Sequence, residues 1–149
     1  MLLRGNDTKY PRESGILLHI TSLPSPYGIG SFGAAAYKFV DFLKKSGQTY
    51  WQLLPLCPVG KGNSPYSSVC SFAGEPLLID LDELAADGFL YPSDIPEGTF
   101  SQNADYKRAR EFKLPLIRRA AKNFNRKDRG FCDFRRENAY WLQDYALFT

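Results

Sequence analysis

The sequence predicts an α/β fold in which two parallel strands flank a helix. Two runs, GILLHITSL (residues 15–23) and TYWQLLPL (residues 49–56), are almost continuously apolar, as strands buried on both faces are. The segment between them has the 3.6-residue periodicity of an amphipathic helix. Strand, helix and strand in this order form a right-handed βαβ unit with a parallel pair. The length of 149 residues favours one domain.

The helix between the two runs has a predicted start and a predicted end. Ser31 is a candidate N-cap, because its hydroxyl can accept a hydrogen bond from a free backbone N–H. Gly47 is expected to end the helix, at a position where a left-handed conformation is needed. The side chains predicted for its buried face are Ala36, Phe39, Val40 and Leu43.

A loop rich in Pro, Gly and Ser, residues 57–74, follows the second run. A short helix from Leu81 to Asp87 comes next. Asp80 and Glu83 have capping-box spacing at its start, and Gly88 follows its end.

Two longer helices are predicted after the short one. The first covers Asp105 to Phe124 and is expected to break or kink near Pro115. The second covers Phe131 to Phe148. Its stripe alternates steps of three and four residues: Phe131, Phe134, Asn138, Trp141, Tyr145 and Phe148. Asn138 lies within this stripe, so its amide is expected to be buried and bonded to the backbone of a neighbouring loop.

Gly28, Gly30 and Gly33 have the G-x-G-x-x-G spacing of a dinucleotide-binding turn. Such a turn needs a strand that leads almost directly into the first glycine, and an acidic residue at the end of the second strand. Here TSLPSPY intervenes, and the second strand ends in LLPL. The glycines are better interpreted as letting the loop fold tightly over the strand end and the helix pack closely.

The loops after the two strands suit a neutral, polyhydroxylated ligand. In parallel α/β folds, ligands meet the loops at the carboxyl ends of the strands. These two loops offer hydroxyls, an amide and aromatic rings, with few charges. The candidates are His19, Thr21, Ser22 and Tyr27 in the first loop, and Asn63, Ser64, Tyr66, Ser67 and Ser68 in the second. A loop-packed aromatic is an equally good interpretation of Tyr66 from composition alone.

Catalytic and metal-binding groups are not apparent in this chain. His19, the single histidine, lies in a run expected to be buried and is interpreted as a hydrogen-bonded core residue. Glycoside chemistry needs two carboxylates that flank the scissile bond, and neither strand ends in one. The nearest acids fit loop and helix-start roles: Glu75, Asp80, Asp82 and Glu83. No catalytic residue, metal site or cofactor is expected.

Composition and charge argue against several other classes of protein. The net charge of +3 and the absence of a long basic run argue against nucleic-acid binding. No stretch is apolar enough to span a membrane, and the first ten residues hold too short an apolar run for a signal peptide. The three cysteines have the spacing of neither a disulfide framework nor a metal site. A reducing, cytoplasmic location is expected.

Four blocks of sequence, taken together, resemble one family. SGILLHITSLPSPYGIGSFG, YWQLLPLCPVGKGNSPYSS, SFAGEPLLIDLDEL and ENAYWLQDYALF look like the N-terminal portion of 4-α-glucanotransferases, the amylomaltases or disproportionating enzymes of glycoside hydrolase family 77. The resemblance implies a (β/α)8 TIM barrel with an inserted helical subdomain, of which this chain holds the first two strands. It divides the chain into the first barrel units (1–60), a substrate-side loop (61–80), and a helical insertion with the start of the next barrel helix (81–149).

The resemblance also implies an activity. Family members transfer α-1,4-glucan segments between maltooligosaccharides through a covalent glucosyl-enzyme, with retention. The tyrosine of the family's SPY loop lines the donor sugar site; here it is Tyr66, with Ser64 beside it, and Tyr27 of the first loop is the third substrate-binding candidate. Lys61 stands where some members have a tyrosine at a second glucan site.

The family's catalytic carboxylates lie beyond Thr149, so this chain alone is expected to be inactive. The alternative function is a stand-alone, non-catalytic glucan-binding or scaffolding module. Two strands alone also leave each strand with an unpaired edge. We therefore expect self-association, or a further strand recruited from elsewhere in the sequence.

Overall fold

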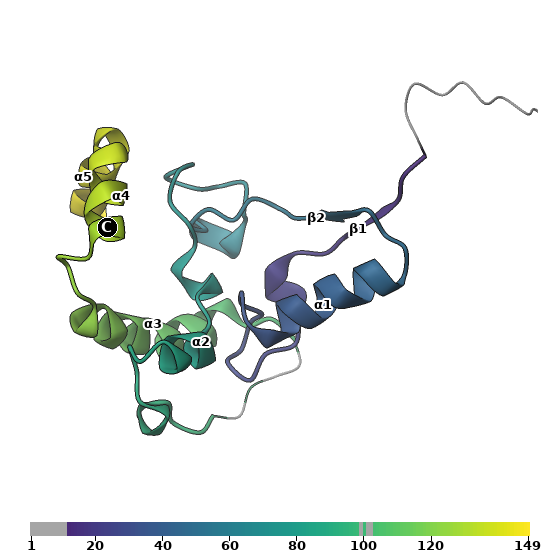
Figure 1. The fold of residues 1–149 in the computed structure, drawn as a ribbon, viewed down its shortest axis with the longest axis horizontal. Coiled ribbons are helices and arrows are strands. Elements are labelled where there is room, and N and C mark those ends of the chain that lie inside the picture. Colours follow the sequence, from purple (N-terminus) through teal and green to yellow (C-terminus); the bar gives the residue numbers. More distant parts are fainter. Residues whose placement is uncertain (1–11, 99, 101–102) are drawn as a thin grey trace, which may run out of the picture.

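A computed structural model describes residues 12–98, 100 and 103–149 (Figure 1). Strand β1 (Gly15–Leu17) pairs in parallel with strand β2 (Tyr50–Gln52), and helix α1 (Ala34–Lys45) connects the two. The predicted strand–helix–strand unit with parallel strands is therefore confirmed. The first ten residues, which the sequence analysis considers for a signal peptide, lie outside the described residues.

Both strands are shorter and more exposed than the apolar runs predict. Each has three residues, and Leu17 of β1 is 56% exposed. Burial on both faces is a wrong prediction for the described chain, because packing comes from the side of α1, where Trp51 meets Phe39 with 4.9 Å between ring centroids. The first apolar run bends into the 3₁₀ helix η1 (Ile20–Ser22), and Ile20 is fully buried there.

The N-cap of α1 is Gly33, so the predicted Ser31 cap is wrong. The Ser31 hydroxyl donates instead to Asp80 Oδ2 at 2.6 Å, because the fold brings this distant carboxylate to the start of α1. A side chain at position 33 would collide with the same carboxylate, since its Cβ would lie 2.2 Å from Asp80 Oδ2. Gly47 ends the helix as predicted, with φ of +69° and its N–H donating to Lys44 O.

The predicted buried face of α1 is correct except for one residue. Ala36 and Leu43 are buried, and Phe39 packs against the cluster around Ile20. Val40 is exposed, because that side of the helix has no packing partner in the described chain.

The glycine-rich loop folds tightly over the end of β1, as interpreted from the sequence. The Gly30 N–H donates to Thr21 O at 3.1 Å, and a Cβ at Gly30 would lie 2.0 Å from Ile20 O. Gly28 adopts a left-handed φ of +89°. These close backbone approaches explain the glycines without a nucleotide.

Helices α2 (Leu81–Ala86) and α3 (Tyr106–Asn123) enclose the main core. Asp80 caps α2 by accepting hydrogen bonds from the N–H groups of Asp82 and Glu83, as its spacing predicts. The reciprocal bond of a capping box, from the Asp80 N–H to the Glu83 side chain, is not formed among the described residues. Helix α3 continues through Pro115, so the chain does not break there. The buried cluster consists of Tyr27, Leu81, Leu90, Leu116 and Ala120. Further 3₁₀ helices are η2 (Lys61–Asn63), η3 (Pro76–Leu78) and η4 (Pro92–Asp94).

The predicted last helix is two helices, α4 (Arg129–Glu137) and α5 (Ala139–Phe148). They lie beside each other at the opposite end of the molecule from β1 (Figure 1). Asn138 separates them: its Nδ2 donates to Phe134 O at 2.9 Å, and its Oδ1 accepts from Trp141 Nε1 at 3.0 Å. The amide is hydrogen-bonded, as predicted, but it is half-buried and its partners belong to these two helices rather than to a loop.

The two strands form a two-stranded sheet, and no third strand joins it within the described residues. The expected recruitment of an extra strand is therefore absent from this part of the chain. None of the helices in the described ranges is both long and apolar enough to cross a membrane.

Candidate functional site

The loop of residues 57–74 leaves the end of the second apolar run and is closed at its base by Glu75. The Glu75 N–H donates to Leu56 O at 2.8 Å, and Glu75 Oε2 accepts from the Val59 N–H at 2.8 Å. The departing and returning ends of the loop are thereby fixed to one another.

The interior of this loop is also ordered by hydrogen bonds. Ser64 Oγ accepts from the Tyr66 N–H at 3.3 Å, and Ser64 O accepts from the Ser67 N–H at 3.2 Å. The loop crosses itself, because a Cβ at Gly60 would lie 2.4 Å from Ser67 O. A short serine-rich turn therefore presents Tyr66.

The ring of Tyr66 points away from the core. It is 74% exposed, so the described chain does not pack it as a loop aromatic. Phe72, near the returning end of the same loop, does pack, with its ring 5.8 Å from Trp141 and 5.5 Å from Tyr140 of α5. Both aromatics of this loop are exposed, but Phe72, at 60%, contacts a helix through its ring, whereas Tyr66 faces outward.

Tyr27 lies in the core instead. Its ring is buried and stacks on Phe112 at 5.9 Å between centroids, and its hydroxyl donates to Asp82 Oδ1 at 2.6 Å. Burial and this hydrogen bond raise the pKa of Tyr27. No hydrogen bond or ring contact joins Tyr27 to Ser64 or Tyr66 in the described chain, so these contacts do not bring the three predicted residues together.

His19 is buried but not hydrogen-bonded through Nδ1. It precedes η1 at the end of the strand, and its Nδ1 has no hydrogen-bond partner among the described residues. The prediction of a hydrogen-bonded core histidine is therefore wrong for this nitrogen. Burial lowers the pKa of His19, which favours the neutral imidazole.

A polar hollow of about 460 Å³ lies beside the first loop. Thr21, Ser22 and Ser25 line it, together with Phe100 and Asn103 from a later segment. Thr21 Oγ1 accepts a hydrogen bond from Tyr106, at the start of α3. The sequence did not indicate Phe100 or Asn103, because no motif or periodicity links them to the first loop.

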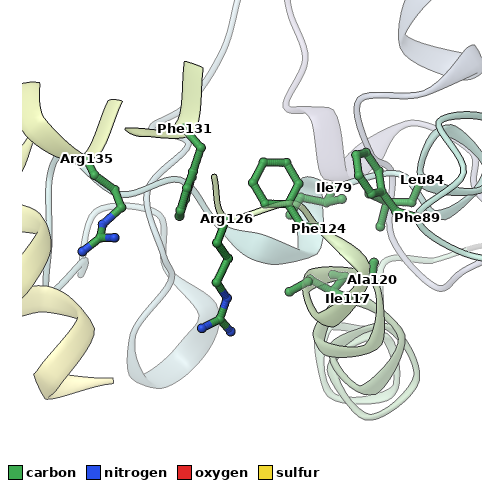
Figure 2. Close-up of a pocket in the computed structure, with 10 residues that line it drawn as sticks. Ile79, Leu84, Phe89, Ile117, Ala120, Phe124, Arg126, Phe131 and Arg135 are labelled. Carbon is green, nitrogen blue, oxygen red and sulfur yellow. The ribbon is translucent and has the colours of Figure 1, made fainter. Parts of the chain in front are cut away.

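A second cavity, of about 660 Å³, is almost entirely apolar (Figure 2). Phe89, just after α2, Phe124, just after α3, and Phe131 of α4 line it, and Figure 2 shows Phe124 between the other two rings. Arg126 and Arg135 are the charged residues of this lining. It offers few polar partners for a sugar.

The acids nearest the candidate loops have structural partners. Glu75 Oε1 accepts from the Leu77 N–H at 3.2 Å, in addition to the bond from Val59 to Oε2. Asp80 caps α2, and Asp82 accepts from Tyr27. Asp82 and Glu83 both lie in the first turn of α2. The loop and helix-start roles predicted for the four acids Glu75, Asp80, Asp82 and Glu83 are therefore confirmed. No group of three or more metal-ligating side chains occurs among the residues that the structure describes.

The sequence profile of one family matches nearly the whole chain. This is glycoside hydrolase family 77, described as 4-alpha-glucanotransferase, and the match covers residues 18–149. The chain belongs to the 4-α-glucanotransferase family. It is 48% identical over 139 residues to the 4-alpha-glucanotransferase of Aquifex aeolicus, and 46% identical over 145 residues to that of Thermus thermophilus. These alignments cover 92% and 93% of this chain.

A solved relative confirms the fold class. The amylomaltase from Streptococcus agalactiae in complex with acarbose superimposes with a TM-score of 0.82 and 42% identity, over 91% of this chain. The two parallel strands and their helices thus match part of an amylomaltase TIM-barrel structure. The chain spans 28% of the length of each of these three 4-α-glucanotransferase relatives.

Proposed function

We propose that this chain is the N-terminal portion of a 4-α-glucanotransferase that transfers α-1,4-glucan segments between maltooligosaccharides by a retaining double displacement. The observation that carries the proposal is the family match over residues 18–149. The expected setting is cytoplasmic, in accord with the three unpaired cysteines. No cofactor is needed for such a transfer.

Tyr66 and Ser64 are the proposed sugar contacts. An exposed ring on an ordered loop can stack on the apolar face of a pyranose, while the neighbouring hydroxyl bonds a sugar hydroxyl. A sugar contact for Tyr27 stays a prediction with less support, since both its ring and its hydroxyl already have protein partners.

Catalysis by this chain alone is not expected. A retaining glycosyl transfer needs a nucleophilic carboxylate and an acid/base carboxylate on either side of the bond. Glu75, Asp80 and Asp82 are held by backbone and tyrosine partners instead. Incubation with maltotriose, followed by chromatography, should yield neither glucose nor longer oligosaccharides, and a product ladder above the blank would contradict this.

The sugar site is tested by titrating the protein with maltoheptaose in a calorimeter. Tyr66→Ala should raise Kd about tenfold, a loss of about 1.4 kcal/mol. The melting temperature should hardly change, because the ring is exposed. Tyr91→Ala is the matched control, since Tyr91 is 71% exposed on a different loop. Equal affinities for the two variants would refute the Tyr66 contact.

The competing function is a stand-alone glucan-binding module. It predicts the same Tyr66 effect, so binding does not separate the two. A reading frame that continues past Thr149 into further strand–helix units would favour the enzyme.

A further inference from the structure

Glu75 connects three backbone segments at the base of the loop that carries Ser64 and Tyr66. Its N–H donates to Leu56 O at 2.8 Å, on the departing side of the loop. Its Oε2 accepts from the Val59 N–H at 2.8 Å, within the loop. Its Oε1 accepts from the Leu77 N–H at 3.2 Å, on the returning side.

The other hydrogen bonds of the loop do not fix its position on the molecule. Those of Ser64 and of Ser68 join loop residues to each other. They set the shape of the loop but do not join it to the rest of the molecule. Beyond Glu75, the ring of Phe72 ties the returning end of the loop to α5 through Tyr140 and Trp141.

The carboxylate of Glu75 is held in a buried, charged setting. Glu75 is 8% exposed, and a buried carboxylate is stable only when its oxygens are bonded. Lys113 of α3 is fully buried and donates through Nζ to Leu77 O at 2.5 Å, on the same turn that Glu75 caps. The bond from Lys113 to Leu77 O therefore links the base of the loop to α3.

We propose that Glu75 is a positioning residue for glucan binding, which orients the loop of residues 57–74 so that Ser64 and Tyr66 meet the sugar. This inference rests on the proposed function. Glu75 itself touches no sugar in this proposal. Both of its side-chain oxygens are required, because each accepts from a different backbone N–H.

Glu75→Gln is the informative substitution. Glutamine keeps the shape of the side chain but has one accepting oxygen, so its NH₂ group would face a backbone N–H. Either Val59 or Leu77 then loses its acceptor. Glu83→Gln is the matched control, because Glu83 is an exposed acid on the neighbouring helix α2.

Limited trypsin digestion reports on the loop directly. Lys61 lies in η2 within the loop, whereas Lys45 lies at the exposed end of α1. Glu75→Gln should speed cleavage after Lys61 about tenfold relative to cleavage after Lys45, and should raise Kd for maltoheptaose about tenfold. Glu83→Gln should change neither quantity. A role in overall stability alone would speed both cleavages together.

The outcomes separate this inference from the proposed function. If Glu75→Gln behaves as wild type while Tyr66→Ala weakens binding, the positioning role is overturned and the sugar site stands. If Tyr66→Ala binds as wild type, the sugar site fails, and the Lys61 cleavage rate still reports on whether Glu75 orders the loop. Should Glu75→Gln not fold, amide hydrogen exchange of the wild-type protein decides: the Val59 N–H should be protected, and fast exchange there would overturn the proposal.

Discussion

Lys113 carries a charge into the interior of the chain. Burial lowers its pKa from 10.5 to about 8, although the nearby carboxylates of Asp80 and Glu75 favour the charged form. An unfolded lysine keeps its ordinary pKa. Between about pH 8 and 10.5 the unfolded chain therefore binds more protons than the folded one, and the free energy of unfolding rises with pH across this window.

Lys113→Met should remove this pH dependence. The free energy of unfolding of wild type relative to the variant should increase by up to about 3 kcal/mol from pH 8 to 10.5, at about 1.4 kcal/mol per pKa unit. Urea unfolding at several pH values measures it. Lys107→Met, an exposed lysine on the same helix, should follow wild type. If the difference in free energy of unfolding between wild type and Lys113→Met stays constant from pH 8 to 10.5, the lowered pKa of Lys113 is contradicted.

Local spacing predicted some of these residues and long-range contacts decided others. Asp80 was predicted as a cap from its capping-box spacing with Glu83, and its partners in the structure are only two and three residues away. The bond from Ser31 to Asp80 joins residues 49 positions apart, and no local pattern could show it. Ser64 and Tyr66 were selected from the candidates in the loop by the family resemblance, since composition alone left the role of Tyr66 undecided.

At the scale of elements, apolar periodicity predicted the order of the strands and helices along the chain better than their lengths. It correctly predicted two strands flanking a helix. It overestimated the length and burial of the strands, because burial depends on what covers the face of the sheet that is turned away from α1. It also gave one helix where α4 and α5 are two. The stripe runs on through both, but the Asn138 side chain bonds the carbonyl four residues before it and competes with the helix backbone.

The junction of α4 and α5 should depend on the amide of Asn138. Asn138→Ala removes a donor to Phe134 O and the acceptor of Trp141 Nε1. We expect a loss of about 1–2 kcal/mol in stability, and a change in Trp141 fluorescence. Gln143→Ala, an exposed amide on α5, is the control. Unchanged thermal unfolding of Asn138→Ala would show that the junction is held by ring packing instead.

At the scale of the whole molecule, the resemblance predicted the barrel relationship, which the two-strand pattern could not. Two strands and one helix are common to many α/β folds. The match to a solved amylomaltase over 91% of the chain assigns them to a TIM barrel. The proposed division at residues 60 and 80 stays a prediction. Neither the apolar pattern nor the family resemblance could predict how much apolar surface the described chain leaves exposed.

Self-association is the last prediction, and it follows from that surface. Within the described residues each strand has one unpaired edge. Large apolar side chains are exposed on several elements, including Leu17 on β1 and Phe42 on α1. An unpaired strand edge beside apolar side chains invites pairing with another copy. The purified protein should therefore sediment as a concentration-dependent mixture and bind a hydrophobic dye.

Leu17→Lys tests whether the strands mediate this association. A charged side chain on an edge strand opposes edge-to-edge pairing, so the variant should shift toward monomer by at least about tenfold in its dissociation constant. Val69→Lys adds the same charge at an exposed apolar position in the loop of residues 57–74, and should associate as wild type does. A monodisperse wild-type monomer with a sharp thermal transition and no dye binding would overturn the prediction. It would also favour the stand-alone glucan-binding module, because a self-sufficient domain has no need of further barrel strands to cover its sheet.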